Sequence, residues 1–121
     1  MENKFKDKTL NILGTDYKFE FRNESDEPKL QNKDGFCDTT VKRIVIRTDY
    51  NNDLNTVEDI EYYIAKVIRH EIIHAFLYES GLSYNSWGEN EEVVDWFSIQ
   101  FEKITNAIDK ILVETNYNNG A

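Results

Sequence analysis

The stretch VIRHEIIHAFL, residues 67–77, sets two histidines and a glutamate among closely spaced apolar side chains. Apolar residues within and just before this stretch point in nearly every direction on a helical wheel, and a helix that is apolar all round is usually buried. We therefore expect a buried helix that carries His70, Glu71 and His74 into the interior. Polar groups in such a place are costly unless they have a partner.

The ends of this helix are marked by capping residues. Thr56, followed three residues later by Asp59, resembles a capping box at the start of a helix. Gly81 can adopt the left-handed conformation that ends many helices. The helix is therefore predicted to run from Thr56 to about Ser80.

A second long helix is predicted to begin near Asn90, to break near Lys103 and to be followed by a disordered tail at 116–121. Its apolar residues recur at helical spacing and are expected to form one buried stripe. The stripe consists of Val93, Val94, Phe97, Phe101, Ile104, Ile108, Ile111 and Leu112.

Three β-strands are predicted ahead of the helices. Thr9–Leu13 and Tyr17–Arg22 flank Gly14-Thr15-Asp16, a short loop that suits a hairpin, and aromatic residues alternate with charged ones in the second strand. Val41–Thr48 is another alternating run, expected at an edge of the sheet. Asn23–Asp34 is polar and is predicted to be a surface loop.

This order of elements predicts an α+β fold, in which a small three-strand sheet packs on the buried helix and a second long helix follows. A chain of 121 residues can bury one core but not two, so residues 1–121 are expected to form a single domain.

Composition restricts the class of protein further. The formal net charge of −9 argues against a general affinity for nucleic acid or anionic membranes, and the scattered acids are expected mainly to confer solubility. Cys37 is the only cysteine, which excludes an internal disulfide and favours a reducing compartment. The first residues lack the apolar core of a signal peptide, and no run approaches the roughly 18 apolar residues of a membrane span. We expect a soluble, cytoplasmic protein.

The two histidines predict a zinc site. His70 and His74 are four residues apart, so on a helix both imidazoles point from one face and can bind one Zn²⁺ ion. Glu71 projects about 100° away, where it can take a proton from a water bound to the ion. No other histidine is present in the chain.

A catalytic zinc site needs a third protein ligand and an open position for water. Because no histidine remains, the third ligand must be a carboxylate or Cys37. Glu91 and Asp95 share one helical face, and Glu91 lies nearer the buried stripe than Glu92 does. Glu91 is therefore the first candidate, with Glu92, Asp95 and Cys37 as alternatives. The alternative without a functional role is that Glu91 and Glu92 bind no metal and only stabilise the start of a helix.

The stretches RHEIIHAF, at 69–76, and NEEVVDW, at 90–96, resemble the gluzincins. These are zinc metallopeptidases with an HExxH motif on one helix and a glutamate ligand on the next. The short length and the order of strands and helices are similar to the minimal zincins of bacteriophages and mobile elements, including the kind that cleaves repressors. The resemblance covers roughly Val41–Phe101.

The resemblance implies roles for particular residues. Glu71 would be the general base, and Asp95 would orient a histidine through its ring N–H. Val41–Thr48 would be the edge strand along which a peptide lies by β-augmentation. The zinc ligands implied are His70, His74 and Glu91.

The chain departs from the larger gluzincins in two respects. Those enzymes stabilise the oxyanion with a further histidine or tyrosine, and here no histidine remains. Tyr84, in the loop between the two predicted helices, is our candidate, with Tyr78 and Tyr50 as alternatives. There is also no second lobe, and a shallow cleft argues against efficient general proteolysis.

The expected function is zinc-dependent hydrolysis of a peptide bond in one dedicated protein substrate. Two alternatives remain open. The first is a binding protein with a structural zinc site, which would have four protein ligands with Cys37 or Asp95 as the fourth. The second is a small acidic inhibitor of a host or nucleic-acid enzyme, with acids concentrated on one face away from His70. Neither nucleic acid nor a membrane is expected as a direct partner.

Overall fold

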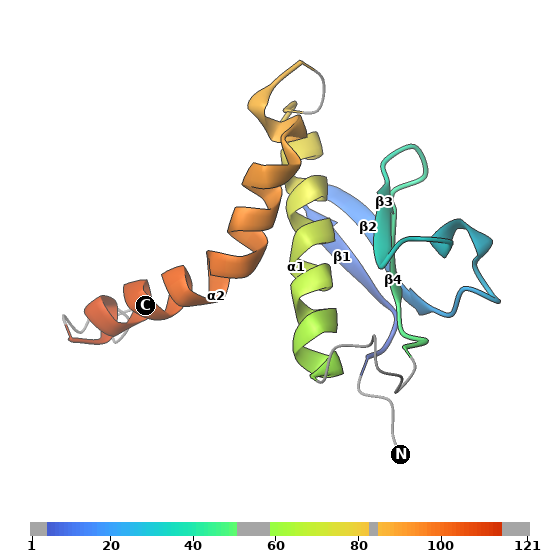
Figure 1. Cartoon of the computed structure of the whole chain (residues 1–121). Coiled ribbons are helices and arrows are strands. Elements are labelled where there is room, and N and C mark those ends of the chain that lie inside the picture. The colour runs from blue at the N-terminus through green and yellow to red at the C-terminus, as the bar shows by residue number, and fades with distance from the viewer. Residues whose placement is uncertain (1–4, 51–58, 83–84, 115–121) are drawn as a thin grey trace.

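The computed structural model describes residues 5–50, 59–82 and 85–114, which form an α+β fold. Helix α1 covers one face of a four-strand sheet, and α2 packs against α1 before it projects away from the sheet (Figure 1). The strands are β1 (Lys8–Ile12), β2 (Thr15–Arg22), β3 (Gly35–Asp38) and β4 (Arg43–Arg47). The helices are α1 (Ile60–Glu79) and α2 (Glu91–Glu114), with short 3₁₀ turns η1 (Pro28–Leu30) and η2 (Trp87–Glu89).

The hairpin of β1 and β2 is tighter than predicted. Leu13 and Gly14 both have positive φ angles, 49° and 94°, as in the two-residue turns that match the twist of paired strands. Thr15 and Asp16 therefore belong to β2, where they pair with the end of β1. The predicted loop at Gly14-Thr15-Asp16 is wrong in this detail, because a glycine with positive φ completes the turn earlier.

The predicted edge strand lies inside the sheet. The strand order is β1-β2-β4-β3, with β4 parallel to β2 and antiparallel to β3. Ile44, Val45 and Ile46 are all fully buried, which requires cover on both faces of the strand. The edge position predicted for Val41–Thr48 is therefore wrong, and so is the count of three strands. The missed strand β3 forms the edge next to β4, and β1 forms the other edge.

The segment at 23–34 covers the face of the sheet opposite α1 (Figure 1). Its Leu30 is fully buried, and Arg47 of β4 donates a hydrogen bond to the Leu30 carbonyl at 2.5 Å. The segment is polar, as the sequence indicates, but it also buries an apolar residue. Its presence explains why Val45 is not exposed.

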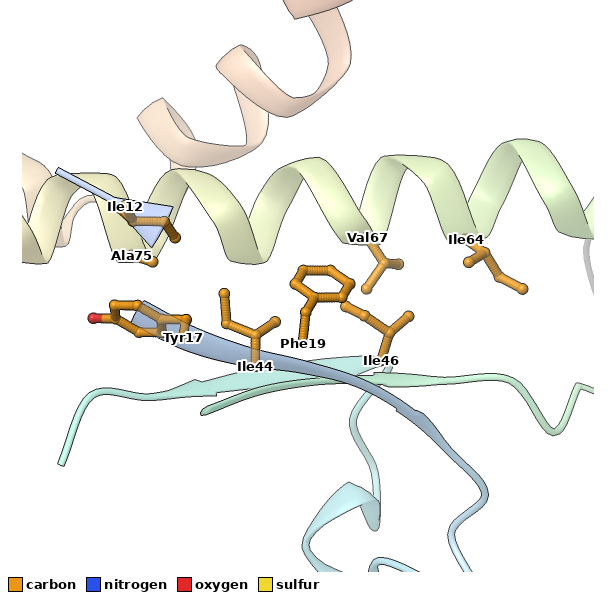
Figure 2. Close-up of a cluster of buried hydrophobic side chains, with 8 residues drawn as sticks. All are labelled: Ile12, Tyr17, Phe19, Ile44, Ile46, Ile64, Val67 and Ala75. Atoms are coloured by element: carbon orange, nitrogen blue, oxygen red, sulfur yellow. The ribbon is translucent and has the colours of Figure 1, made fainter. Parts of the chain in front are cut away.

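The core lies between α1 and the other face of the sheet (Figure 2). On α1, Ile64, Val67, Glu71 and Ala75 recur at spacings of three or four and form the buried face. Glu71 thus occupies a position that would otherwise be apolar. The remaining core side chains come from the sheet: Ile12, Tyr17, Phe19, Ile44 and Ile46.

α1 is buried on two sides rather than on all sides. Tyr62 is 57% exposed and Phe76 is 42% exposed, so the expectation of a helix buried all round is wrong. In the described part of the chain, the sheet, α2 and the short turn η2 cover this helix. Asp59 caps the helix by accepting a hydrogen bond from the Tyr62 backbone N–H, whereas Thr56 lies outside the described residues. Gly81, with φ of 83°, follows its end as predicted.

α2 is one continuous helix from Glu91 to Glu114, so the break predicted near Lys103 is not found, but the helix bends partway along its length (Figure 1). Asn90 caps its start by accepting from the Val93 N–H at 3.1 Å. Within α2, Val94 and Ser98 are buried, whereas the predicted stripe is exposed from Phe97 onward along most of its length. The predicted tail at 116–121 lies outside the described residues. No helix in the described part of the chain is long and apolar enough to cross a membrane.

Glu79 joins the end of α1 to the sheet. Its carboxylate accepts hydrogen bonds from Thr15 Oγ1 at 2.8 Å and Tyr17 Oη at 2.7 Å, and Lys42 Nζ lies 3.1 Å away. The Tyr17 and Thr15 hydroxyls and the Lys42 ammonium lower the pKa of Glu79 below its ordinary value of 4.5. The ionised form is thus favoured in the folded protein.

We expect Glu79→Gln to lower the melting temperature at pH 7 by roughly 2–6 °C. Because the folded-state pKa is lowered, the contribution of Glu79 is complete above pH 4.5 and is lost as the pH falls through the folded pKa. The difference from wild type should therefore narrow in acid. Thermal melts followed by circular dichroism from pH 3 to 7 test this, with exposed Asp26→Asn as control. A difference that stays constant with pH would contradict it.

Candidate metal centre

Three predicted zinc ligands come together where α2 begins beside α1. His70 Nε2 and His74 Nε2 lie 3.1 Å apart. The two carboxylate oxygens of Glu91 lie 3.3 Å from His70 Nε2 and 3.0 Å from His74 Nε2. All three residues offer a donor atom within 4.8 Å of the others, and they are the one such group among the described residues.

Asp95 holds His70 from the other side of its ring. Asp95 Oδ1 lies 2.9 Å from His70 Nδ1. An ionised carboxylate can only accept a hydrogen bond, so Nδ1 is the donor to Asp95, and in the neutral imidazole Nε2 then presents its lone pair to the cluster. Glu91 and Asp95 are one helical turn apart, which lets α2 reach both sides of the same imidazole. This is the orienting contact that the resemblance implies for Asp95.

The donor set and its spacing fit a zinc ion. Imidazole nitrogen and carboxylate oxygen are ordinary zinc ligands, and donors at about 2.1 Å from a tetrahedral ion lie about 3.4 Å from one another. The separations of 3.0–3.3 Å are close to that value. One ion at the centre would satisfy all three donors.

The contact between the helices sets this geometry. Arg69, next to His70, donates from Nε to the Ser98 carbonyl at 2.6 Å, and Ser98 is 1% exposed. Val94, one turn earlier, is fully buried. These contacts fix the first two turns of α2, and therefore Glu91, against the histidine-bearing face of α1.

Glu71 lies beside the cluster and is not part of it. Its side chain is 7% exposed and lines a cavity of about 660 Å³ that His70, His74 and Glu91 also line. Burial, and next the negative charge of Glu91, raise the pKa of Glu71 to about 7. Burial also lowers the pKa of His74, which favours the neutral imidazole that binds metals.

The other candidate ligands stand apart from the cluster. Glu92 is exposed on α2, and neither it nor Cys37 joins the group that the described residues form. Cys37 lies on β3 and lines the cavity, but burial raises the pKa of its thiol to about 12. Asp95 is engaged with the opposite nitrogen of His70. Of the four carboxylate and thiol candidates, only Glu91 joins His70 and His74 in the group.

The structure describes two of the three tyrosines proposed to stabilise the oxyanion. Tyr84 lies outside the described residues. Tyr50 donates to Asp34 Oδ1 at 3.1 Å, and its hydroxyl is engaged there. Tyr78 lines the cavity, and the ammonium of Lys42 sits 4.7 Å from the centre of its ring. Tyr78 is thus the described tyrosine best placed to reach a bound molecule.

Two features of the cavity were missed from the sequence. Lys33 and the edge strand β3 line the wall opposite the histidines. Strand β3 has only four residues and no clear alternation, so the sequence carries little signal for it. The one available hint was the fully apolar run Ile44-Val45-Ile46, which indicates a strand covered on both faces and is more typical of an internal strand than of an edge strand.

Comparison with known proteins adds nothing to this geometry. No protein-family model matches the chain, and no curated protein or solved structure is significantly similar to it. The chemistry of the cluster itself must therefore support any assignment of function.

We expect protein purified without chelator to carry one zinc ion per chain. His74→Ala removes one of three donors and should lose the ion, with its helical content retained because His74 lies outside the main core. Elemental analysis and far-ultraviolet circular dichroism test this. Wild-type protein that contains no metal and does not take up added zinc would contradict the metal centre.

Glu91→Gln should weaken zinc binding far more than Glu92→Gln. Loss of a supporting residue around a metal typically costs 10–100-fold in affinity, and loss of a direct ligand should cost at least about 10-fold. The change at exposed Glu92 should stay within about 2-fold, since its side chain is outside the cluster. Competition with a chromophoric chelator measures both. Equal losses would show that α2 does not supply Glu91 as a ligand.

Proposed function

We propose that this protein is a zinc-dependent metallopeptidase. The observation that carries the proposal is the convergence of three donors, from His70, His74 and Glu91, on a cavity that also contains the buried carboxyl of Glu71. Three protein ligands with a neighbouring general base are typical of catalytic zinc sites, whereas structural sites usually have four ligands. The cavity leaves room for a substrate beside the ligands.

In this proposal each residue of the site has a distinct role in hydrolysis. A bound zinc ion would make water more acidic and polarise the scissile carbonyl. Glu71 would accept the proton of the attacking water and pass it to the leaving amine. Asp95, through His70 Nδ1, keeps the ligand nitrogen turned toward the ion. Tyr78 would donate to the developing oxyanion, with Tyr84 as the alternative.

The substrate would bind along β3, one of the two edge strands of the sheet. Its outer backbone groups pair with no other strand of the described chain, so an extended peptide can add there as a further strand. Gly35, Phe36 and Cys37 of β3 line the same cavity as Glu71. A peptide on this edge would cross the metal centre.

The other two functions have less support. A structural zinc site would need a fourth protein ligand, and Asp95 and Cys37 stand outside the cluster. An acidic decoy would need its acids free on one face, but Glu20, Glu24 and Glu27 form ion pairs with arginines of β4. The proposal includes a single dedicated protein substrate and a cytoplasmic setting, which the lone cysteine supports.

The decisive variant is Glu71→Gln. Because Glu71 is not a ligand, zinc content and folding should stay near wild type, while loss of the general base should lower the rate by about 10²–10⁴-fold. Hydrolysis of a library of fluorescence-quenched peptides by zinc-loaded protein measures the rate. Glu92→Gln is the matched control and should keep full activity. Equal rates for wild type and zinc-loaded Glu71→Gln would overturn the proposed peptidase.

A further inference from the structure

From Phe97 onward, α2 carries an apolar stripe that is exposed. The C-terminal part of the helix projects away from α1 and the sheet (Figure 1), whereas Phe97 and Phe101 line an apolar groove together with Ile73 and Phe76 of α1. Five large side chains of the stripe are between 37% and 57% exposed. We call these residues the α2 seam: Phe97, Phe101, Ile104, Ile108 and Ile111.

The spacing of the α2 seam indicates what kind of surface would cover it. Its residues follow one another at steps of four, three, four and three, which is the heptad pattern of a helix that packs lengthwise on another helix. Val94 continues the series toward the start of α2, where it is fully buried against the body of the protein. The stripe thus already packs within the chain at one end and continues beyond that contact.

The charges around the α2 seam favour a second copy of the same chain. Within 97–111 the charged residues are Glu102, Lys103, Asp109 and Lys110, which sum to zero in a protein of net charge −9. The positions that flank the seam are uncharged, namely Ser98, Gln100, Thr105 and Ala107. Two acidic copies can therefore meet here without repulsion. The segment also lacks the cluster of basic residues with which interfacial helices bind anionic membranes.

We propose that two copies of this chain associate through their α2 seams as an antiparallel, two-fold symmetric helix pair. Phe101 of each copy then lies opposite Ile111 of the other, and Ile104 lies opposite Ile108. The segment spans about 22 Å at 1.5 Å per residue, which is short for a coiled coil, so the interface is small and the dimer is expected to be weak and to depend on concentration. Glu91 lies at the other end of α2, and the metal centre stays open in the dimer.

Sedimentation velocity of the full chain tests the dimer over about 1–200 µM. We expect the mass to rise with concentration from 14.3 kDa toward twice that value. Ile108→Glu should raise the dissociation constant by more than about 10-fold, because it places two like charges in the seam. Val113→Glu is the matched control, since Val113 is an apolar residue of α2 that is 63% exposed and lies off the seam.

Helical content and zinc content of Ile108→Glu should equal those of wild type, because Ile108 is 52% exposed. A wild-type mass of 14.3 kDa at every concentration would overturn the dimer. Equal effects of Ile108→Glu and Val113→Glu would overturn the seam as its surface. Flotation with neutral and anionic lipid vesicles completes the test. A monomer that binds vesicles through Ile108 would assign the stripe to a membrane surface instead.

Discussion

The packing of one face of α1 on the sheet controls the rest of the structure. Ile64, Val67 and Ala75 lie on this face with Glu71, and each large apolar side chain buried there contributes about 1.5–3 kcal/mol. This packing fixes the rotation of α1 about its axis. At about 100° per residue, His70 and His74 then both fall on the same flank of Glu71, at about 100° and 60° from it. The core contact therefore determines where the two candidate metal ligands point.

The second constraint is the contact between the start of α2 and the middle of α1. Buried Val94 and Ser98, with the hydrogen bond from Arg69, hold the first two turns of α2 in place. Glu91 and Asp95 then reach the two nitrogens of His70. The contact with α1 is short, so most of α2 lies beyond it. The α2 seam is exposed because no described segment packs on that part of the helix.

The sheet places an edge strand beside the ligands because β4 is internal. β4 is covered by α1 on one face and by the 23–34 segment on the other, so all three of its central residues can be apolar. Its terminal arginines pair with glutamates of neighbouring segments, which accounts for part of the acidic composition. The short strand β3 is left on the outside, where it lines the cavity with Glu71.

The sequence by itself determined the α+β class, the hairpin, both long helices and the candidates His70, Glu71, His74, Glu91 and Asp95. These depend on local periodicity, capping and spacing along one helix, which neighbouring residues specify. Only the tertiary structure decided that β3 rather than β4 is the edge, that Glu91 rather than Glu92 faces the histidines, and that the stripe of α2 is exposed. Each of these depends on which surfaces distant segments present to one another, and periodicity reports that a face is apolar but not what covers it.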